Sequence, residues 1–179
     1  MEQRNILQPN TELRFDSGAK YVVEDVIGIG SLCVLYRAYY TDSLGLKKYV
    51  KMKEYNPAKI SLKRNRDLSM EVPEREYQYF LKMKERMIQS YMVSHDLTRE
   101  EHISNYFSNA ENIHEANGTV YIIYSYMEGQ DLAHYQVKSL REAIRLTVSV
   151  AKIISRIHKA GYLYLDIKLP CLHTWHHHK

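Results

Sequence analysis

Alternation of apolar and polar residues in the first third of the chain predicts β-strands. Residues 20–40 form two apolar-rich runs, interrupted only by a short stretch that contains Gly28 and Gly30. Two such runs joined by a glycine-containing turn are typical of a β-hairpin, so we expect the glycines at its tip. A further run over 48–55 stops before Pro57, whose missing N–H cannot continue a sheet. The pattern therefore predicts three antiparallel strands before any helix.

Helical periodicity appears next. Between 76 and 92, apolar residues recur every three or four positions without a glycine or proline, which predicts an amphipathic helix. The charged segment 58–75 lacks periodicity, and we expect a surface excursion there. Thr98 begins a capping-box pattern, which predicts a short second helix ending at about Phe107.

A second hairpin completes the predicted sheet. Asn117-Gly118 is the strongest hairpin signal in the chain and joins an expected strand over 111–116 to another over 119–126. We therefore expect five strands, preceded by a polar and loosely held leader over residues 1–18.

The pattern changes from strands to a helix after Gly129. Ser139 and Glu142 have capping-box spacing, and Gly161 provides a stop signal, so a helix is expected over about 139–159. Its apolar face comprises Leu140, Ile144, Val148, Ala151, Ile154 and Ile157. Together these elements predict an α+β fold, with an antiparallel sheet and a helix first and further helices after the boundary at Gly129.

Composition narrows the classes of function. The net charge of +4 is mild, and basic residues alternate with acidic ones, so we expect solvated faces and no nucleic-acid partner. Sixteen tyrosines leave a basic, aromatic-rich nucleic-acid surface as a weaker alternative. Cys33 and Cys171 lack metal-ligand spacing, which suits a reducing compartment. The apolar run over 120–126 is far shorter than a membrane span, so we expect a cytoplasmic protein without a membrane segment.

The glycines at the first hairpin are the first candidate binding residues. By themselves Gly28 and Gly30 would fit a tight turn without a function. Between two strands, however, Gly28-x-Gly30-x-x-Cys33-x-Leu35 resembles the glycine-rich loop of protein kinases, whose backbone N–H groups close over nucleotide phosphates. Cys33 stands where that family usually has its third glycine.

Lys53 resembles the lysine on the third strand of the same family, which holds the α and β phosphates of ATP. In kinases this lysine pairs with a glutamate on the following helix. We favour Glu85 as the partner, with Glu76 as the alternative. Lys51 departs from the family, where a small apolar residue packs on adenine. Strand alternation would aim Lys51 and Lys53 at one face, so either nucleotide binding is altered or a bulge turns Lys51 outward.

The segment from Tyr121 to Leu132 resembles the strand and hinge that link the two kinase lobes. The resemblance implies that Tyr124 is the gatekeeper and that the backbones of Ser125 and Met127 meet the adenine edge. It also implies that Asp131 reaches the ribose.

The run from His158 to Lys168 is the strongest match, because it resembles the kinase catalytic loop. The resemblance implies that Asp166 accepts or orients the proton of the substrate hydroxyl and that Lys168 stabilises charge on the transferred phosphoryl group. Tyr164 and Leu165 replace the family's His and Arg.

The resemblance fails after Lys168. Cys171 stands where the family has an asparagine that binds Mg²⁺, and no D-F-G sequence follows. The family implies ATP and Mg²⁺, but both protein groups that hold the metal are missing. We therefore expect negligible phosphoryl transfer by the chain as printed. We interpret 171–179 as a non-family tail from a shifted reading frame or a vector, with 176–178 as part of an affinity tag.

The whole pattern is identified as part of a bacterial-type, eukaryotic-like Ser/Thr protein kinase that acts on an unspecified protein. The resemblance covers residues 7–168 of 179, where a complete kinase fold would need roughly 250. The expected organisation is a leader (1–18), a kinase-like N-lobe (19–128), a partial C-lobe with the catalytic loop (129–170) and the tail (171–179).

Two further expectations follow. The alternative function is a non-catalytic, pseudokinase-like binding module, which Lys51 and Cys33 favour. The apolar face of the helix over 139–159 would lack the rest of a C-lobe to pack against, so we also expect a homodimer through this helix.

Overall fold

The computed structural model describes residues 4–99, 110–126, 129–165, 167 and 173–175, with only the backbone at 98–99, 129–130 and 173–175. The chain forms two compact units. The first contains residues 1–96 and 109–126, and the second contains 97–108 and 127–179.

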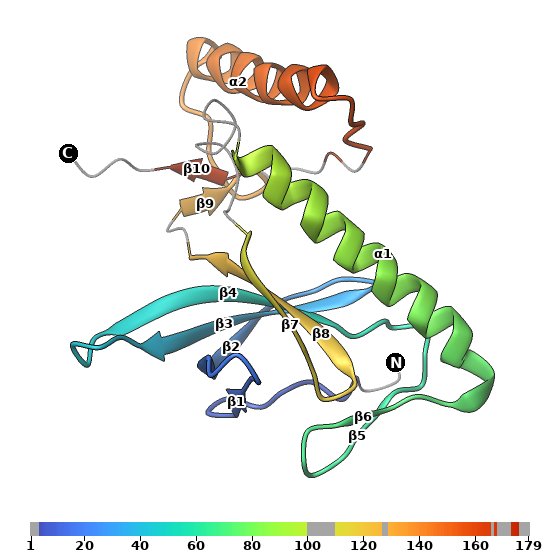
Figure 1. The fold of residues 1–179 in the computed structure, drawn as a ribbon. Helices are drawn as coiled ribbons and strands as arrows, with labels where there is room; N and C mark the ends of the chain where they lie inside the picture. Colours follow the sequence, from blue (N-terminus) through green and yellow to red (C-terminus); the bar gives the residue numbers. More distant parts are fainter. Residues whose placement is uncertain (1–3, 100–109, 127–128, 166, 168–172, 176–179) are drawn as a thin grey trace. The chain divides into compact units, whose positions relative to one another are not determined.

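The first unit is built on a six-stranded antiparallel sheet with the strand order β1-β2-β3-β4-β8-β7 (Figure 1). Its strands are β1 Glu12–Arg14, β2 Lys20–Ile29, β3 Cys33–Thr41, β4 Lys47–Tyr55, β7 Ala110–Ala116 and β8 Thr119–Ser125. Both predicted hairpins are confirmed. At the second, Asn117 and Gly118 have φ angles of 54° and 73°, as a two-residue turn between twisted strands requires.

The N-terminal segment differs from the loosely held leader that we expected. Leu7 and Leu13 are each 1% exposed, and Phe15 is buried beside them. Strand β1 pairs with β2 and becomes the sixth strand of the sheet. The segment is mostly polar in sequence, but its few apolar side chains cover one face of the sheet and bind it there.

The segment after β4 is also more ordered than the expected surface excursion. Its short strands, β5 Lys63–Arg64 and β6 Met70–Glu71, form a separate hairpin. Ile60, Leu62 and Met70 are buried in a core shared with the first helix. Few, widely spaced anchors hold this segment, which explains why it shows no sequence periodicity.

Helix α1, Glu74–Arg99, confirms the predicted amphipathic helix and extends it. Phe80, Met87 and Tyr91 are buried on its apolar side, and Tyr55 donates a hydrogen bond from its hydroxyl to the Phe80 carbonyl at 3.0 Å. Thr98 lies inside α1, so a second helix does not begin there as predicted. Residues 100–107 of that predicted helix lie outside the described part of the chain.

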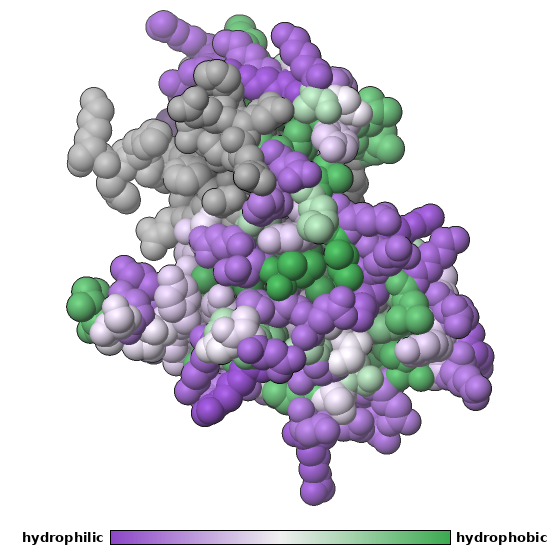
Figure 2. Space-filling view, in the orientation of Figure 1, coloured by the Kyte–Doolittle hydropathy of each residue, from purple (hydrophilic) through white to green (hydrophobic). Residues whose placement is uncertain are grey.

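The two faces of the sheet bury different sets of residues. One face packs against the N-terminal segment through residues that include Val34, Tyr36, Met52 and Tyr121. The other packs against α1 and the 60–70 region through residues that include Val120 and Ile122. The surface in Figure 2 is mostly hydrophilic, with smaller apolar patches.

The second unit contains helix α2, Leu140–Lys159, and a two-stranded sheet of β9 Gly129–Asp131 and β10 His173–Trp175 (Figure 1). The Ser139 hydroxyl caps α2 by accepting a hydrogen bond from the Glu142 N–H at 3.2 Å. Gly161 follows the helix with φ of 87°, which confirms the predicted stop. Residues 173–175 of the predicted non-family tail form a strand, β10.

No helix in the described ranges is long and apolar enough to span a bilayer.

Candidate nucleotide site

The tip of the β2–β3 hairpin is a tight loop, as the glycines predicted. The Gly30 N–H donates to the Cys33 carbonyl at 2.9 Å and closes the turn. A Cβ atom at Gly28 would lie 3.3 Å from Leu35 Cδ1, so a side chain at Gly28 would crowd the Leu35 side chain opposite it. Irregular register between Val26 and Gly28 shifts β2 just before the loop. The glycine at position 28 therefore leaves room for the Leu35 side chain.

Gly28, Leu35 and Lys53 form one row across three neighbouring strands. Gly28 pairs with Leu35 across β2 and β3, and Leu35 pairs with Lys53 across β3 and β4. Directly paired residues project to the same face of a sheet, and Ile122 on β8 extends the row. The structure thus brings these predicted site residues together beside the glycine loop. Their roles in binding a nucleotide stay predictions.

Lys51 lies on the same face as Lys53. The register of β4 is continuous with β3 from Cys33 to Thr41 and with β8 from Val50 to Glu54, so the alternative of a bulge that turns Lys51 outward is wrong. The Lys51 ammonium lies 5.3 Å from the centre of the Tyr124 ring, close enough for a cation–π interaction. Burial is the main cause that raises the pKa of Tyr124 to about 12.

Neither candidate glutamate pairs with Lys53 in the described part of the chain. Glu76 accepts a hydrogen bond from the Ser61 N–H at 3.2 Å, and its other carboxylate oxygen lies 3.5 Å from Arg75. Glu85 is exposed on α1. Lys53 therefore has no carboxylate partner among these residues, and the choice between Glu85 and Glu76 stays open.

A buried ionic network that was not predicted from the sequence lies on the opposite face of β4. Glu54 is 0% exposed, its carboxylate lies 2.7 Å from Arg64, and it accepts a hydrogen bond from the Tyr36 hydroxyl at 2.8 Å. Burial, with the Glu54 charge as a second cause, raises the pKa of Tyr36. The signal was present in the alternation Val50-x-Met52-x-Glu54, which places a carboxylate on the apolar face.

The remaining predicted residues are Ser125, at the end of β8 in the first unit, and four residues in the range of the second unit. Ser125 ends β8, opposite Val50. Asp131 ends β9, and its two carboxylate oxygens lie 2.8 and 2.9 Å from Nδ1 of His134. This hydrogen bond is the largest of the causes that hold the pKa of Asp131 below its ordinary value. Met127, Asp166 and Lys168 lie outside the described residues.

Comparison with known proteins supports the fold. No protein-family model matches the sequence, and neither does a curated protein. The apo form of PpkA-294 is similar at 27% identity with a TM-score of 0.72, over 92% of this chain and 56% of that one. The Mycobacterium tuberculosis PknI kinase domain matches at 18% identity with a TM-score of 0.51, over 92% and 56% of the two chains. The BubR1 kinase domain matches at 17% identity with a TM-score of 0.56, over 95% and 45%.

The neighbours show that the chain has the fold of protein kinase domains. It is an α+β chain with a kinase-like N-lobe and part of a C-lobe, which confirms the predicted fold class. The chain spans about half the length of the kinase structures that it matches.

Proposed function

We propose that this chain is the nucleotide-binding part of a protein kinase that transfers the γ-phosphoryl group of ATP to a serine or threonine hydroxyl. The row of Gly28, Leu35 and Lys53 beside the glycine loop is the observation that supports it. Backbone N–H groups of the loop would bind phosphate oxygens, and the Lys53 ammonium would neutralise their charge.

The proposed reaction needs positioning and charge more than covalent help from the protein. The substrate oxygen forms a bond to the γ-phosphorus while the bond from that phosphorus to the oxygen bridging the β- and γ-phosphates breaks. Asp166 receives the hydroxyl proton, and Lys168 stabilises charge on the phosphoryl group. The roles of these two residues rest on the resemblance of 158–168 to a catalytic loop.

Mg²⁺ normally accompanies ATP in this class of fold and neutralises the phosphates. The described residues contain no group of three His, Cys, Asp or Glu side chains that would hold a metal ion. Cys171 also stands in place of the family's metal-binding asparagine. Neither the described residues nor Cys171 supplies the groups that would hold Mg²⁺, so we propose that phosphoryl transfer by this chain is negligible.

A non-catalytic binding module is the second candidate. Lys51 faces the same side as Lys53 and lies over Tyr124, where the family has a small side chain against adenine. Lys53 also lacks a glutamate partner in the described part of the chain. Both observations favour a kinase-like unit that binds nucleotide weakly and acts through a partner.

Thermal unfolding with increasing ATP and Mg²⁺ separates the two candidates. At 100 times its dissociation constant, a ligand stabilises the folded state by roughly 2.7 kcal/mol. We expect stabilisation of the wild type and its loss in Lys53→Met. The control Lys63→Met, whose side chain is 73% exposed on β5, should behave as the wild type. An unchanged melting temperature of the wild type would contradict nucleotide binding and support the module.

A further inference from the structure

Arg4 holds the tip of the glycine-rich loop by its backbone carbonyls. One guanidinium nitrogen donates to the Gly30 carbonyl at 2.6 Å and lies 3.4 Å from the Cys33 carbonyl. The other terminal nitrogen donates to the Ser31 carbonyl at 2.9 Å. A residue 26 positions before Gly30 in sequence therefore binds three carbonyls of a single turn.

The segment after β4 binds the same turn from its backbone. The Asn56 N–H donates to the Leu32 carbonyl at 3.0 Å, and the Ala58 N–H donates to the Ser31 carbonyl at 2.9 Å. Each backbone carbonyl of residues 30–33 thus accepts a hydrogen bond from a donor of the protein. The N–H groups of Ser31 and Leu32, by contrast, have no acceptor among the described residues. Backbone N–H groups without an acceptor can bind an anionic ligand, and carbonyl oxygens that already accept hydrogen bonds are kept away from it.

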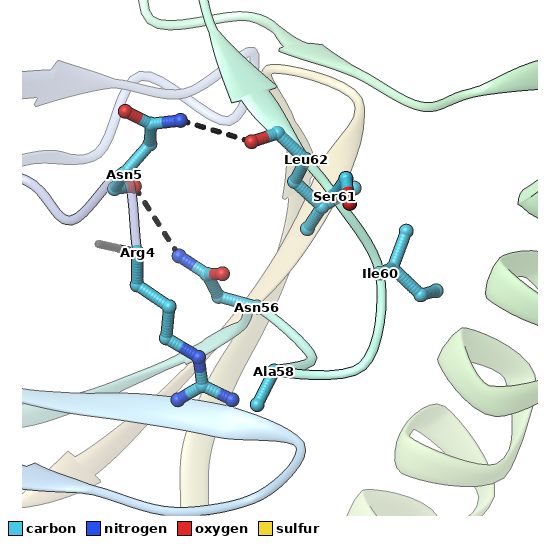
Figure 3. A pocket seen from close by; sticks show the side chains of 7 residues that line it. All are labelled: Arg4, Asn5, Asn56, Ala58, Ile60, Ser61 and Leu62. Atoms are coloured by element: carbon cyan, nitrogen blue, oxygen red, sulfur yellow. Dashed lines mark hydrogen bonds between the residues drawn. The ribbon is translucent and has the colours of Figure 1, made fainter. Parts of the chain in front are cut away.

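Arg4 is held in place by its neighbours. The Asn5 carbonyl accepts hydrogen bonds from the Asn56 side chain at 3.3 Å and from Arg64 Nε at 3.1 Å. The Asn5 amide donates to the Leu62 carbonyl at 2.9 Å. Arg4, Asn5, Asn56 and Leu62 are among the residues that line a pocket of about 200 Å³, where the guanidinium of Arg4 lies beside Ala58 (Figure 3). Two residues further on, Leu7 is 1% exposed in the core.

We propose that Arg4 is a positioning residue for the glycine-rich loop. It turns the loop carbonyls away from the bound phosphates and leaves the N–H groups of Ser31 and Leu32 free for them. This inference rests on the proposed nucleotide-binding function. Its structural part, that Arg4 orders the loop, can be measured without a nucleotide.

An arginine suits this role better than a lysine. The planar guanidinium presents several donors in a fixed fork and reaches neighbouring carbonyls together, whereas an ammonium group is a single point of charge. Partial burial lowers the pKa of Arg4, yet an arginine stays charged at neutral pH. Substitution by lysine should therefore preserve the charge but only part of the loop order.

Hydrogen exchange in the nucleotide-free protein tests the ordering. We expect Arg4→Ala to speed exchange of the Gly30, Asn56 and Ala58 amides by roughly tenfold, as expected for loss of a charged hydrogen bond. Arg4→Lys should give an intermediate rate. Arg14→Ala, a control at a side chain that is 77% exposed, should leave these amides unchanged. Unchanged exchange in Arg4→Ala would overturn the proposal.

Titration of the same variants with ATP and Mg²⁺ tests the functional part. Arg4→Ala should bind roughly tenfold more weakly, with partial rescue by Arg4→Lys, while its urea unfolding midpoint stays near that of Arg14→Ala. Equal nucleotide affinity despite faster exchange would overturn the role in binding. If the wild type binds no nucleotide but exchange responds as expected, the ordering by Arg4 holds and the proposed function fails.

Discussion

Single residues on β4 face two different environments because side chains alternate along a strand. Lys51 and Lys53 project to the face with the glycine loop, whereas Glu54 projects into the core against Arg64 and Tyr36. A buried carboxylate is stable only when paired and hydrogen-bonded. The adjacent pair Lys53-Glu54 therefore combines a candidate binding residue with a core ion pair.

Removal of the Glu54 carboxylate should destabilise the protein strongly. In Glu54→Ala the Arg64 charge, whose side chain is 7% exposed, would stay buried without its partner. We expect a loss of about 3–5 kcal/mol in the free energy of unfolding, measured by urea denaturation. Glu71→Ala, at a side chain that is 62% exposed, should change stability by less than about 1 kcal/mol. Equal effects of the two substitutions would show that the network contributes little.

At the level of elements, the N-terminal segment is joined to β7 by an aromatic stack. Phe15 and His114 stack with ring centroids 4.2 Å apart, and the Ser17 hydroxyl lies 3.4 Å from Nδ1 of His114. Nε2 of His114 is buried without a hydrogen-bond partner in the described ranges. Burial lowers the pKa of His114 below its ordinary value of 6.5.

This lowered pKa predicts that the protein loses stability in mild acid. As the pH falls below about 6.5, His114 binds a proton in the unfolded chain before it does so in the folded chain. The free energy of unfolding therefore decreases as the pH is lowered, until the pH passes the lower pKa of His114 in the folded state. His114→Phe keeps the stack but removes the titration. We expect its stability to change less than that of the wild type between pH 7.5 and 5.5, measured by chemical denaturation at each pH. A parallel pH dependence of the two proteins would contradict this.

The sequence predicted those elements that carry local signals and missed those that do not. Strands β2, β3, β4 and β8 and both helices follow from periodicity, turn residues and caps, which act within a few residues. Strand β1 escaped because it is only three residues long and buries a single apolar side chain, Leu13. The buried residue Leu62 escaped because it lies in a charged segment and its core partners on α1 and β8 are distant in sequence. Likewise, no local pattern could predict that Arg4 binds the loop at Gly30, since only the folded sheet brings them together.

At the scale of the whole molecule, α2 presents an apolar face in the structure. Leu140 is 78% exposed, Ile144 is 56% and Val148 is 45%, whereas Ile157 is buried. Exposed apolar residues at helical spacing favour association.

The expected homodimer through α2 stays a prediction, and light scattering after gel filtration tests it. We expect a mass near twice that of one chain at high concentration and a shift to the monomer in Ile144→Lys. Lys152→Ala, on the same helix at an exposed position, serves as the control. A monomer at every concentration would rule out association through this face.

In the function proposed above, the glycine loop and Lys53 form one nucleotide site. The most direct measurement is the change in backbone amide NMR shifts during a titration with ATP and Mg²⁺. We expect the largest changes at Gly28, Gly30, Leu35 and Lys53, which the sheet places in and beside one row. Changes in β1 and the β5–β6 hairpin should be small. Shift changes that avoid this row, or the absence of any saturable change, would contradict it.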